Sequence, residues 1–210
     1  VASMPGGYLW QQIPENVARF QLKHMVKPIN PIKDFIVLFE LRVVIKKFKP
    51  DIIHLHSSKA GVLGRLSSIF KSKRIVYTVH GFDSIRLKHR TFLPIEKVLQ
   101  RFCGAIVGVS DYDKKNLIAE KITENVRVVY NGISENSITP INNLPNFNKT
   151  RKTVLTIARI SPPKNLDIFL ETAKRLPQYD FVWLGGSSKY SVEELYKMYS
   201  VAENVKLCGD

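Results

Sequence analysis

Short apolar runs alternate with longer amphipathic segments along most of the chain. Residues 75–79 read I-V-Y-T-V, a β-branched and aromatic run typical of a strand that is buried on both faces. Comparable runs predict three further strands, at 52–56, 105–109 and 126–130. The segments between them predict helices at 32–48, 62–70, 92–102 and 112–121. This repeated strand–helix order predicts an α/β fold with a doubly wound, Rossmann-type parallel sheet.

The pattern breaks between Ser134 and Lys152, where Asn, Pro, Ser and Thr are frequent and no period is sustained, as is typical of a linker. The alternation then restarts, with strands expected at 154–158, 181–184 and 205–207 and helices at 166–176 and 192–199. We therefore expect a first Rossmann-like domain over residues 1–133, a linker over 134–152, and the beginning of a second domain over 153–210. A sheet of about three strands is small for a complete domain, so the chain is predicted to be a fragment.

The charge balance is the compositional anomaly. The 210 residues include 32 Lys and Arg against 18 Asp and Glu, a formal net charge of +14 at pH 7. Such an excess indicates a polyanionic partner: nucleic acid, an anionic membrane surface or a phosphorylated ligand. The cations concentrate at 71–74 and 86–90, and neither stretch carries the interleaved aromatic residues of a single-strand nucleic-acid groove. A solvated basic face is the simpler interpretation of both stretches, and contact with anionic lipid is the functional one.

No feature of the sequence indicates a membrane span or secretion. No apolar run approaches about 20 residues, and the first residues lack the pattern of a signal peptide. Cys103 and Cys208 lie in apolar segments and offer no disulfide framework. We therefore expect a cytoplasmic protein, held peripherally at the inner face of the cell membrane where its basic stretches meet lipid.

His80 is the first candidate for chemistry. It follows the run 75–79 and precedes Gly81, at the carboxyl end of an expected parallel strand. Ligands of open parallel sheets bind outside the carboxyl ends of the strands, and an imidazole exchanges protons near neutral pH. Glycine after it allows a sharp turn or a close approach to a ligand. From these residues alone, the simpler interpretation is a histidine that caps the strand or bonds a backbone carbonyl.

A second group of polar side chains ends the preceding strand. His54 and His56 are two residues apart and therefore share a face, but no third ligand at a recognisable spacing accompanies them, so no metal site is expected. Ser57, Ser58 and Lys59 follow, with hydroxyls, amides and a cation suited to a phosphate or a sugar hydroxyl. An ordinary helix entry explains these three residues equally well.

The loop 159–165 reads R-I-S-P-P-K-N and joins an expected strand to the N-terminus of an expected helix. Arg159 and Lys164 bring two cations to the positive end of the helix dipole, which suits a diphosphate that gains negative charge as it leaves. The alternative for Arg159 is a structural salt bridge. Gly185 and Gly186 repeat the arrangement after the next strand as a weaker candidate for a donor-side loop, because a Gly-Gly turn needs no ligand.

Five stretches, taken together and in this order, resemble one enzyme family. They are P-D-I-I-H-L-H-S-S-K-A-G-V-L-G-R-L from Pro50, Y-T-V-H-G-F from Tyr77, V-S-D-Y-D-K-K-N-L-I from Val109, V-Y-N-G-I from Val129 and V-L-T-I-A-R-I-S-P-P-K-N-L-D-I-F-L-E-T-A-K-R-L-P from Val154. The family is glycosyltransferase family 4, and the resemblance is greatest to bacterial enzymes that build capsule, exopolysaccharide or O-antigen repeats.

The resemblance implies a GT-B fold, with two Rossmann-like domains facing a cleft. It also implies metal-independent transfer, with retention, of a sugar from a nucleotide-sugar such as a UDP-sugar to a lipid-linked or saccharide acceptor, without a cofactor and without nucleic acid. The histidine matching His80 lies beside the transferred sugar and supports the reacting centre. The pair matching Arg159 and Lys164 binds the donor diphosphate, and the loop matching Ser57 to Lys59 lies on the acceptor side.

Two parts of the family pattern lie outside this chain. The first strand with its glycine-rich loop would precede Val1, and the paired glutamates that hold the donor sugar and ribose would follow Asp210. We therefore expect the chain to be inactive by itself. Two alternatives stay open: a catalytically incomplete fragment with a binding or scaffold role, and a sugar-nucleotide epimerase of similar architecture. The donor sugar, nucleotide base, acceptor, linkage and oligomeric state are not specified by the sequence.

Overall fold

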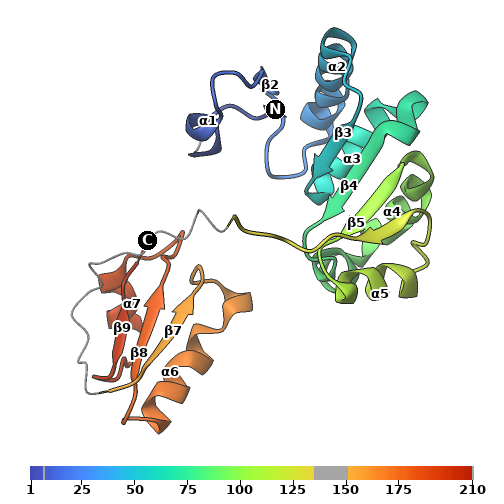
Figure 1. Ribbon diagram of the computed structural model, residues 1–210. Helices are drawn as coiled ribbons and strands as arrows, with labels where there is room; N and C mark the ends of the chain where they lie inside the picture. Colours follow the sequence, from blue (N-terminus) through green and yellow to red (C-terminus); the bar gives the residue numbers. More distant parts are fainter. Residues whose placement is uncertain (7, 135–150, 210) are drawn as a thin grey trace. The chain divides into compact units, whose positions relative to one another are not determined.

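The computed structural model describes residues 1–6, 8–134 and 151–209 (Figure 1). The chain divides into two compact units, Val1–Ser134 and Glu135–Asp210. The linker predicted at 134–152 falls almost entirely on residues 135–150, outside the described residues. Each unit has its own parallel sheet and its own apolar core.

A four-stranded parallel sheet forms the centre of the first unit. Its strands lie in chain order: β3 (Ile53–His56), β4 (Ile75–Val79), β5 (Ala105–Gly108) and β6 (Val126–Val128). The register pairs His56 with Thr78 and Tyr77 with Ile106. The prediction of parallel strands joined by helices is confirmed, and β6 ends two residues earlier than the sequence pattern indicated.

One helix precedes this sheet, and further helices and tight helical turns connect its strands. The helices are α2 (Pro31–Phe48), α3 (Ser58–Ser67), α4 (Leu93–Leu99) and α5 (Asp111–Ala119). The 3-10 segments are η1 (Ile69–Arg74), η3 (Arg90–Phe92) and η4 (Gln100–Phe102), and a π-helical turn, η2, covers Ser84–Lys88.

The predicted boundaries of one helix are wrong. A loop was expected at 57–61 and a helix at 62–70, whereas α3 begins at Ser58 and ends at Ser67. Ser57 has a φ of 74° and accepts a hydrogen bond from the backbone N–H of Ala60, so it caps the helix directly after β3. Ser58 and Lys59 therefore lie in the first helical turn and not in a loop.

The core of the first unit lies on one face of its sheet. Ile75, Tyr77 and Ile106 pack there with Leu93 from α4 and Leu117 from α5. Beside Tyr77, the fully buried guanidinium of Arg65 lies 4.5 Å from the ring centroid and pairs with the Glu96 carboxylate at 2.7 Å. This ion pair joins α3 to α4 beneath the sheet.

The N-terminal residues form a small separate arrangement. The strands β1 (Ala2–Ser3) and β2 (Phe20–Gln21) pair in parallel with each other and are not hydrogen-bonded to the four-stranded sheet. The short helix α1 (Tyr8–Gln12) lies between them in the chain. The sequence pattern predicted neither β2 nor α1, since both are too short to leave a periodic pattern.

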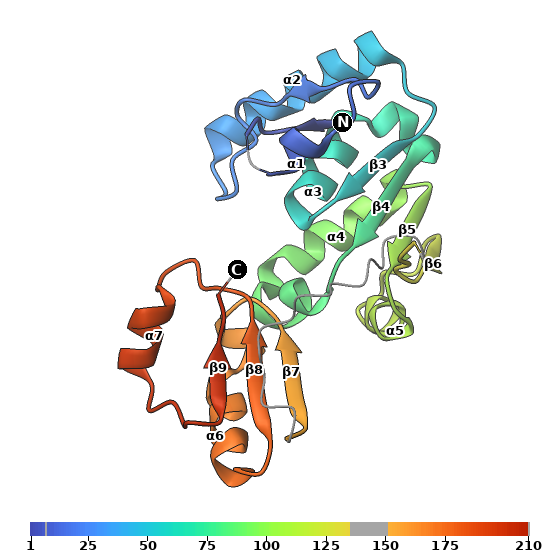
Figure 2. The ribbon, with the colours of Figure 1, turned by 60° about the vertical axis from the view of Figure 1, so that its left-hand side comes forward.

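The described part of the second unit is a three-stranded parallel sheet with two helices, and Figure 2 shows its strands side by side. Its elements are β7 (Thr153–Ile157), η6 (Pro162–Lys164), α6 (Leu166–Arg175), β8 (Asp180–Leu184), α7 (Val192–Met198) and β9 (Val205–Leu207). The buried Phe181 and Trp183 of β8 pack edge-on against the ring of Phe169 from α6. All three strands and both helices agree with the prediction.

Candidate functional site

In the first unit, the candidate groups gather where β3 and β4 end. The two strands are parallel, so their carboxyl ends lie at the same edge of the sheet. His56 is the last residue of β3, Ser57 follows it, and His80 follows β4. Gly81 has a φ of 82°, a conformation that favours glycine and that turns the chain directly after His80. The structure therefore brings His80 beside the residues that the sequence placed after the neighbouring strand.

Three histidine rings form a connected group at this edge. Nδ1 of His56 lies 3.0 Å from Nε2 of His80, so one of these nitrogens donates a hydrogen bond to the other. The rings of His54 and His56 are in contact at a centroid distance of 4.1 Å, and Nε2 of His54 lies 2.8 Å from the Thr78 hydroxyl. The shared face predicted for His54 and His56 is confirmed. Within the described residues, no group of three or more His, Cys, Asp or Glu side chains has the geometry of a metal site.

The surroundings of His56 favour its neutral form. Partial burial lowers the pKa of His56 below its ordinary value, and the nearby imidazoles of His54 and His80 lower this pKa further. A neutral imidazole donates at one ring nitrogen and accepts at the other, so a neutral His56 can be either the donor or the acceptor of the hydrogen bond to His80. His56 can therefore hold the His80 ring in a defined orientation at the edge of the sheet.

Asp113 supports the turn that carries His80, although the sequence pattern did not predict this role. Its carboxylate is buried, accepts a hydrogen bond from the backbone N–H of Phe82 at 3.1 Å and accepts a second from the Ser110 hydroxyl at 2.7 Å. Ser110 in turn caps α5. The only sequence signal was the position of Asp113 in the first turn of a capped helix, which does not reveal a contact 31 residues away.

The predicted acceptor-side residues have different surroundings. Ser57 lies at the end of β3 and caps α3, and Ser58 is the first residue of that helix. The Lys59 ammonium donates to the backbone carbonyls of Val26 at 2.8 Å and Pro28 at 2.6 Å and pairs with Asp34. Lys59 therefore fastens the segment before α2 to α3.

In the second unit, Arg159 and the Gly185–Gly186 turn lie side by side. The backbone N–H of Ala158 bonds the Leu184 carbonyl at 2.9 Å, and that of Ile160 bonds the Gly186 carbonyl at 2.8 Å. Gly185 has a φ of 122°, and a Cβ at this position would lie 2.3 Å from the Ala158 carbonyl oxygen, so only glycine fits. The loop after β7 and the loop after β8 thus run together at the carboxyl edge of the sheet.

Lys164 ends the 3-10 turn that leads into α6. The turn is followed by Asn165 in the left-handed region, with a φ of 51°, and the Asn165 side chain makes no capping hydrogen bond to α6. Arg159 and Lys164 are both exposed, and within the described residues neither forms an ion pair. The salt-bridge alternative for Arg159 therefore has no partner in the described part of the chain. Two exposed cations, the Gly-Gly turn and a helix N-terminus together suit an anion.

Known proteins are similar in sequence to most of this chain. The sequence model "Glycosyltransferase Family 4" matches residues 3–137. The Escherichia coli O-antigen biosynthesis glycosyltransferase WbnH is 29% identical over 196 residues, covering 89% of this chain and 54% of the relative. The E. coli UDP-Gal:alpha-D-GlcNAc-diphosphoundecaprenol alpha-1,3-galactosyltransferase is 28% identical over 190 residues, covering 84% of this chain and 49% of the relative. The chain thus spans about half the length of the curated relatives that it matches.

Solved structures show the same fold. A glycosyltransferase from Rickettsia africae has a TM-score of 0.73 at 19% identity, covering 100% of this chain and 59% of that protein. Anabaena HepE in complex with UDP-glucose has a TM-score of 0.65 at 22% identity, covering 86% of this chain and 53% of that protein. The Neisseria meningitidis UDP-GlcNAc 2-epimerase has a TM-score of 0.55 at 17% identity, covering 90% of this chain and 57% of that protein. The fold therefore does not separate transferase from epimerase.

The sequence match favours the glycosyltransferases. The matched region, 3–137, covers more than half of the chain and includes the whole edge that carries His56, Ser57 and His80. The curated relatives named above are glycosyltransferases of O-antigen biosynthesis or of a diphosphoundecaprenol-linked sugar. The chain belongs to glycosyltransferase family 4, has the GT-B type of fold, and is related to enzymes of bacterial surface polysaccharide synthesis.

Proposed function

We propose that this chain forms part of a retaining glycosyltransferase, which moves a hexose from a UDP-sugar to a lipid-linked or saccharide acceptor in bacterial surface polysaccharide synthesis. The relative whose name specifies UDP-Gal as donor and a diphosphoundecaprenol-linked sugar as acceptor supports both substrate classes. No cofactor or metal is assigned. The net charge of +14 supports a peripheral position at the inner face of the cell membrane, near a lipid-linked acceptor.

The observation that carries this proposal is the arrangement of cations in the second unit. Arg159 lies beside the Gly185–Gly186 turn, and Lys164 lies at the entry to α6. A leaving nucleoside diphosphate gains negative charge as the bond to the sugar breaks, and preorganised cations and helix N–H groups stabilise that charge. We assign Arg159 and Lys164 to the donor diphosphate and the Gly185–Gly186 turn to the close approach of the donor.

We assign His80 to the reacting centre. It lies at the carboxyl edge of the first sheet, and its bond to His56 orients the ring. An oriented imidazole can hydrogen-bond a sugar hydroxyl or carbonyl oxygen and so fix the sugar while the diphosphate leaves. Ser57 and Ser58 are assigned to the acceptor side. For Lys59, we propose that its contribution to this side is to hold the backbone in place, since its ammonium already has partners within the chain.

Activity is proposed for the longer protein and not for these 210 residues alone, because the chain spans about half of its curated relatives. A fragment with only a binding or scaffold role would still bind a diphosphate but would not transfer a sugar. An epimerase would interconvert a UDP-sugar without an acceptor. Incubation with UDP-GlcNAc, followed by analysis of the sugar, tests the epimerase alternative directly.

Calorimetric titration with UDP, UDP-glucose and UDP-galactose tests the proposed diphosphate site. We expect weak binding that weakens further with added salt, because charge supplies most of the attraction. Lys164→Ala should abolish detectable binding, and Arg159→Ala should weaken it about tenfold or more. Lys174→Ala removes an exposed cation from the last turn of α6 and should leave binding unchanged. Equal binding by the wild type and both site variants would contradict the assignment.

A further inference from the structure

The outward face of α2 is apolar although it is exposed. Its side chains at three- and four-residue spacing lie on one face, and this outer stripe consists of Ile32, Phe35, Ile36, Phe39 and Val43. Ile32 is 76% exposed, Phe35 61% and Val43 65%. The opposite face of the same helix provides the fully buried Val37. α2 is therefore apolar on both sides, whereas a surface helix normally turns a polar face to water.

The stripe is one continuous surface. The rings of Phe35 and Phe39 are in edge contact at a centroid distance of 5.1 Å, and the Arg42 guanidinium lies 5.7 Å from the centroid of Phe39. Contiguous exposed apolar surface of this kind usually marks a site of interaction with a protein or a membrane. Within the described residues, no helix is long and apolar enough to cross a bilayer.

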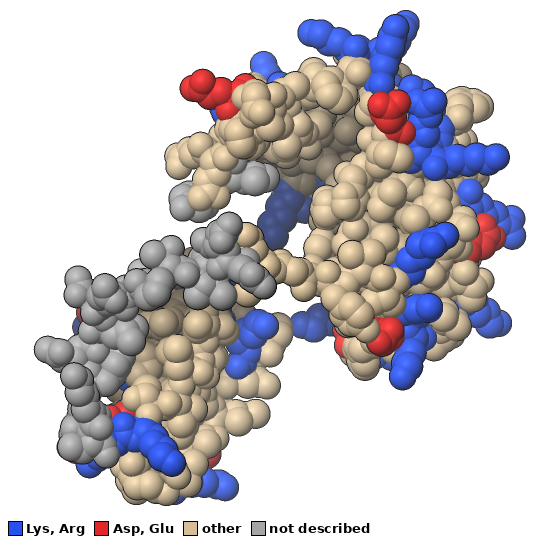
Figure 3. All heavy atoms as spheres, in the orientation of Figure 1, with Lys and Arg blue, Asp and Glu red and all other residues tan. Residues whose placement is uncertain are grey.

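Cations extend the stripe at one end. Arg42, Lys46 and Lys47 follow the apolar residues toward the C-terminal end of α2, and all three are exposed. η1 adds further cations there, since Arg74 donates to the Pro50 carbonyl just beyond α2. Figure 3 shows Lys and Arg side chains gathered over the part of the first unit that contains the end of α2.

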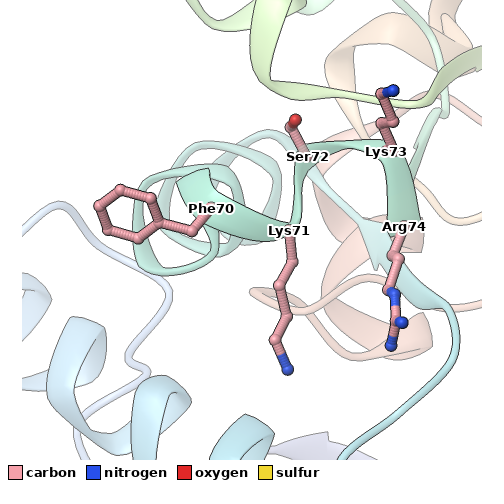
Figure 4. A pocket seen from close by; sticks show the side chains of 5 residues that line it. All are labelled: Phe70, Lys71, Ser72, Lys73 and Arg74. Carbon is pink, nitrogen blue, oxygen red and sulfur yellow. The ribbon is translucent and has the colours of Figure 1, made fainter.

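The segment 70–74 has the same mixture of apolar and basic side chains. It lines a hollow at the amino end of β4, the end of the strand remote from His80. The Phe70 side chain is fully exposed, and Lys71 and Arg74 extend to the same side of η1 (Figure 4). The surface at the end of α2 is therefore basic, with an exposed aromatic ring beside the cations.

We propose that the outer stripe of α2 docks on an anionic lipid bilayer, with the apolar residues at the boundary of headgroups and acyl chains and the cations at its C-terminal end against the headgroups. Helices that lie in a membrane interface combine an apolar face with adjacent Lys and Arg in this way. Nucleic acid would account for the cations but would leave the five apolar side chains in water. The inference rests on the peripheral position in the proposed function and not on the assigned donor or acceptor.

Vesicle cosedimentation of the chain tests this surface without donor or acceptor. The probes are vesicles of phosphatidylglycerol mixed with phosphatidylethanolamine, and vesicles of phosphatidylcholine alone. We expect binding to the anionic vesicles that falls about tenfold or more in Phe35→Ser/Phe39→Ser. Lys46→Gln/Lys47→Gln should lower binding to the anionic vesicles about 30-fold, because each of the two cations is expected to be attracted to an anionic surface.

Matched controls separate this surface from general charge or hydrophobicity. Lys174→Gln/Arg175→Gln removes two cations from the last turn of α6, as Lys46→Gln/Lys47→Gln does from the last turn of α2. Ile168→Ser removes an apolar side chain of α6 that is as exposed as Phe35. Both should bind vesicles as the wild type does. Binding that is unchanged in the α2 variants, or absent in the wild type, would overturn the inference, as would dimerisation abolished by Phe35→Ser/Phe39→Ser. UDP affinity measured on the same samples shows independently whether the diphosphate assignment holds.

Discussion

The histidines at the end of β3 and β4 illustrate how neighbouring side chains set the chemistry of a single residue. His56 contacts a second imidazole on its own strand and hydrogen-bonds a third on the next strand. Burial lowers the pKa of His56, and the nearby imidazoles of His54 and His80 lower it further. Near neutral pH the group therefore offers His80 an uncharged hydrogen-bond partner.

The lowered pKa of His56 predicts a specific loss of stability in acid. In the unfolded chain His56 takes up a proton around its ordinary pKa of 6.5, whereas the folded chain resists protonation until the pH is lower. The contribution of His56 to the free energy of unfolding is thus present above about pH 6.5 and is lost as the pH falls through the folded pKa. His56→Asn should lose less stability than the wild type between about pH 7.5 and about pH 5.

Urea unfolding, followed through the NMR signals of β4 at both pH values, measures this difference. Ser57→Ala alters the neighbouring position without removing a titratable group and should keep the wild-type pH dependence. An identical pH dependence in the wild type and in His56→Asn would show that His56 is not held neutral by the fold.

The sequence identified the residues of the candidate site that lie directly at strand ends. His80, Arg159 and the Gly185–Gly186 turn each follow an apolar run. Because these runs alternate with helices, they predict parallel strands, and residues that follow them lie at the carboxyl edge of a sheet. The sequence did not identify Asp113 or the partners of Lys59, because those contacts join positions 25 to 33 residues apart. Such contacts depend on how the helices pack, which one sequence does not specify.

At the scale of elements, the start of α3 determines where the polar groups after β3 lie. Ser57, with its positive φ, begins the helix directly after β3, and the Lys59 ammonium contacts Val26, Pro28 and Asp34. The predicted loop was wrong because a helix can begin at a serine cap without a preceding linker. The strands were easier to predict, since each is a short β-branched run bounded by polar residues.

This position of Lys59 predicts a structural effect of its removal. Lys59→Met should lower the free energy of unfolding of the first unit by about 2 kcal/mol, because two carbonyls lose a charged donor and the Asp34 carboxylate loses its counter-charge. Lys115→Met, at an exposed position of α5, should cost little. Chemical denaturation of the two variants provides the comparison. Unchanged stability in Lys59→Met would indicate that its ammonium is free to bind a ligand.

At the scale of the whole molecule, the same arrangement occurs twice. Each unit has parallel strands in chain order, and each gathers its candidate polar groups at the carboxyl edge of the sheet. The first unit offers hydrogen-bonded imidazoles and serine hydroxyls, while the second offers cations beside a glycine turn. The sequence predicted this division because the strand–helix alternation restarts after the linker, and the proposed function assigns the acceptor to the first unit and the donor to the second.

We assign the donor diphosphate to the carboxyl edge of β7 and β8. NMR chemical-shift mapping of the isotope-labelled chain, titrated with UDP, tests this assignment at single-residue level. We predict that the largest changes fall on the backbone amides of Arg159, Lys164, Gly185 and Gly186, and that they disappear in Lys164→Ala. Changes confined to the first unit, or no change at millimolar UDP, would contradict the account.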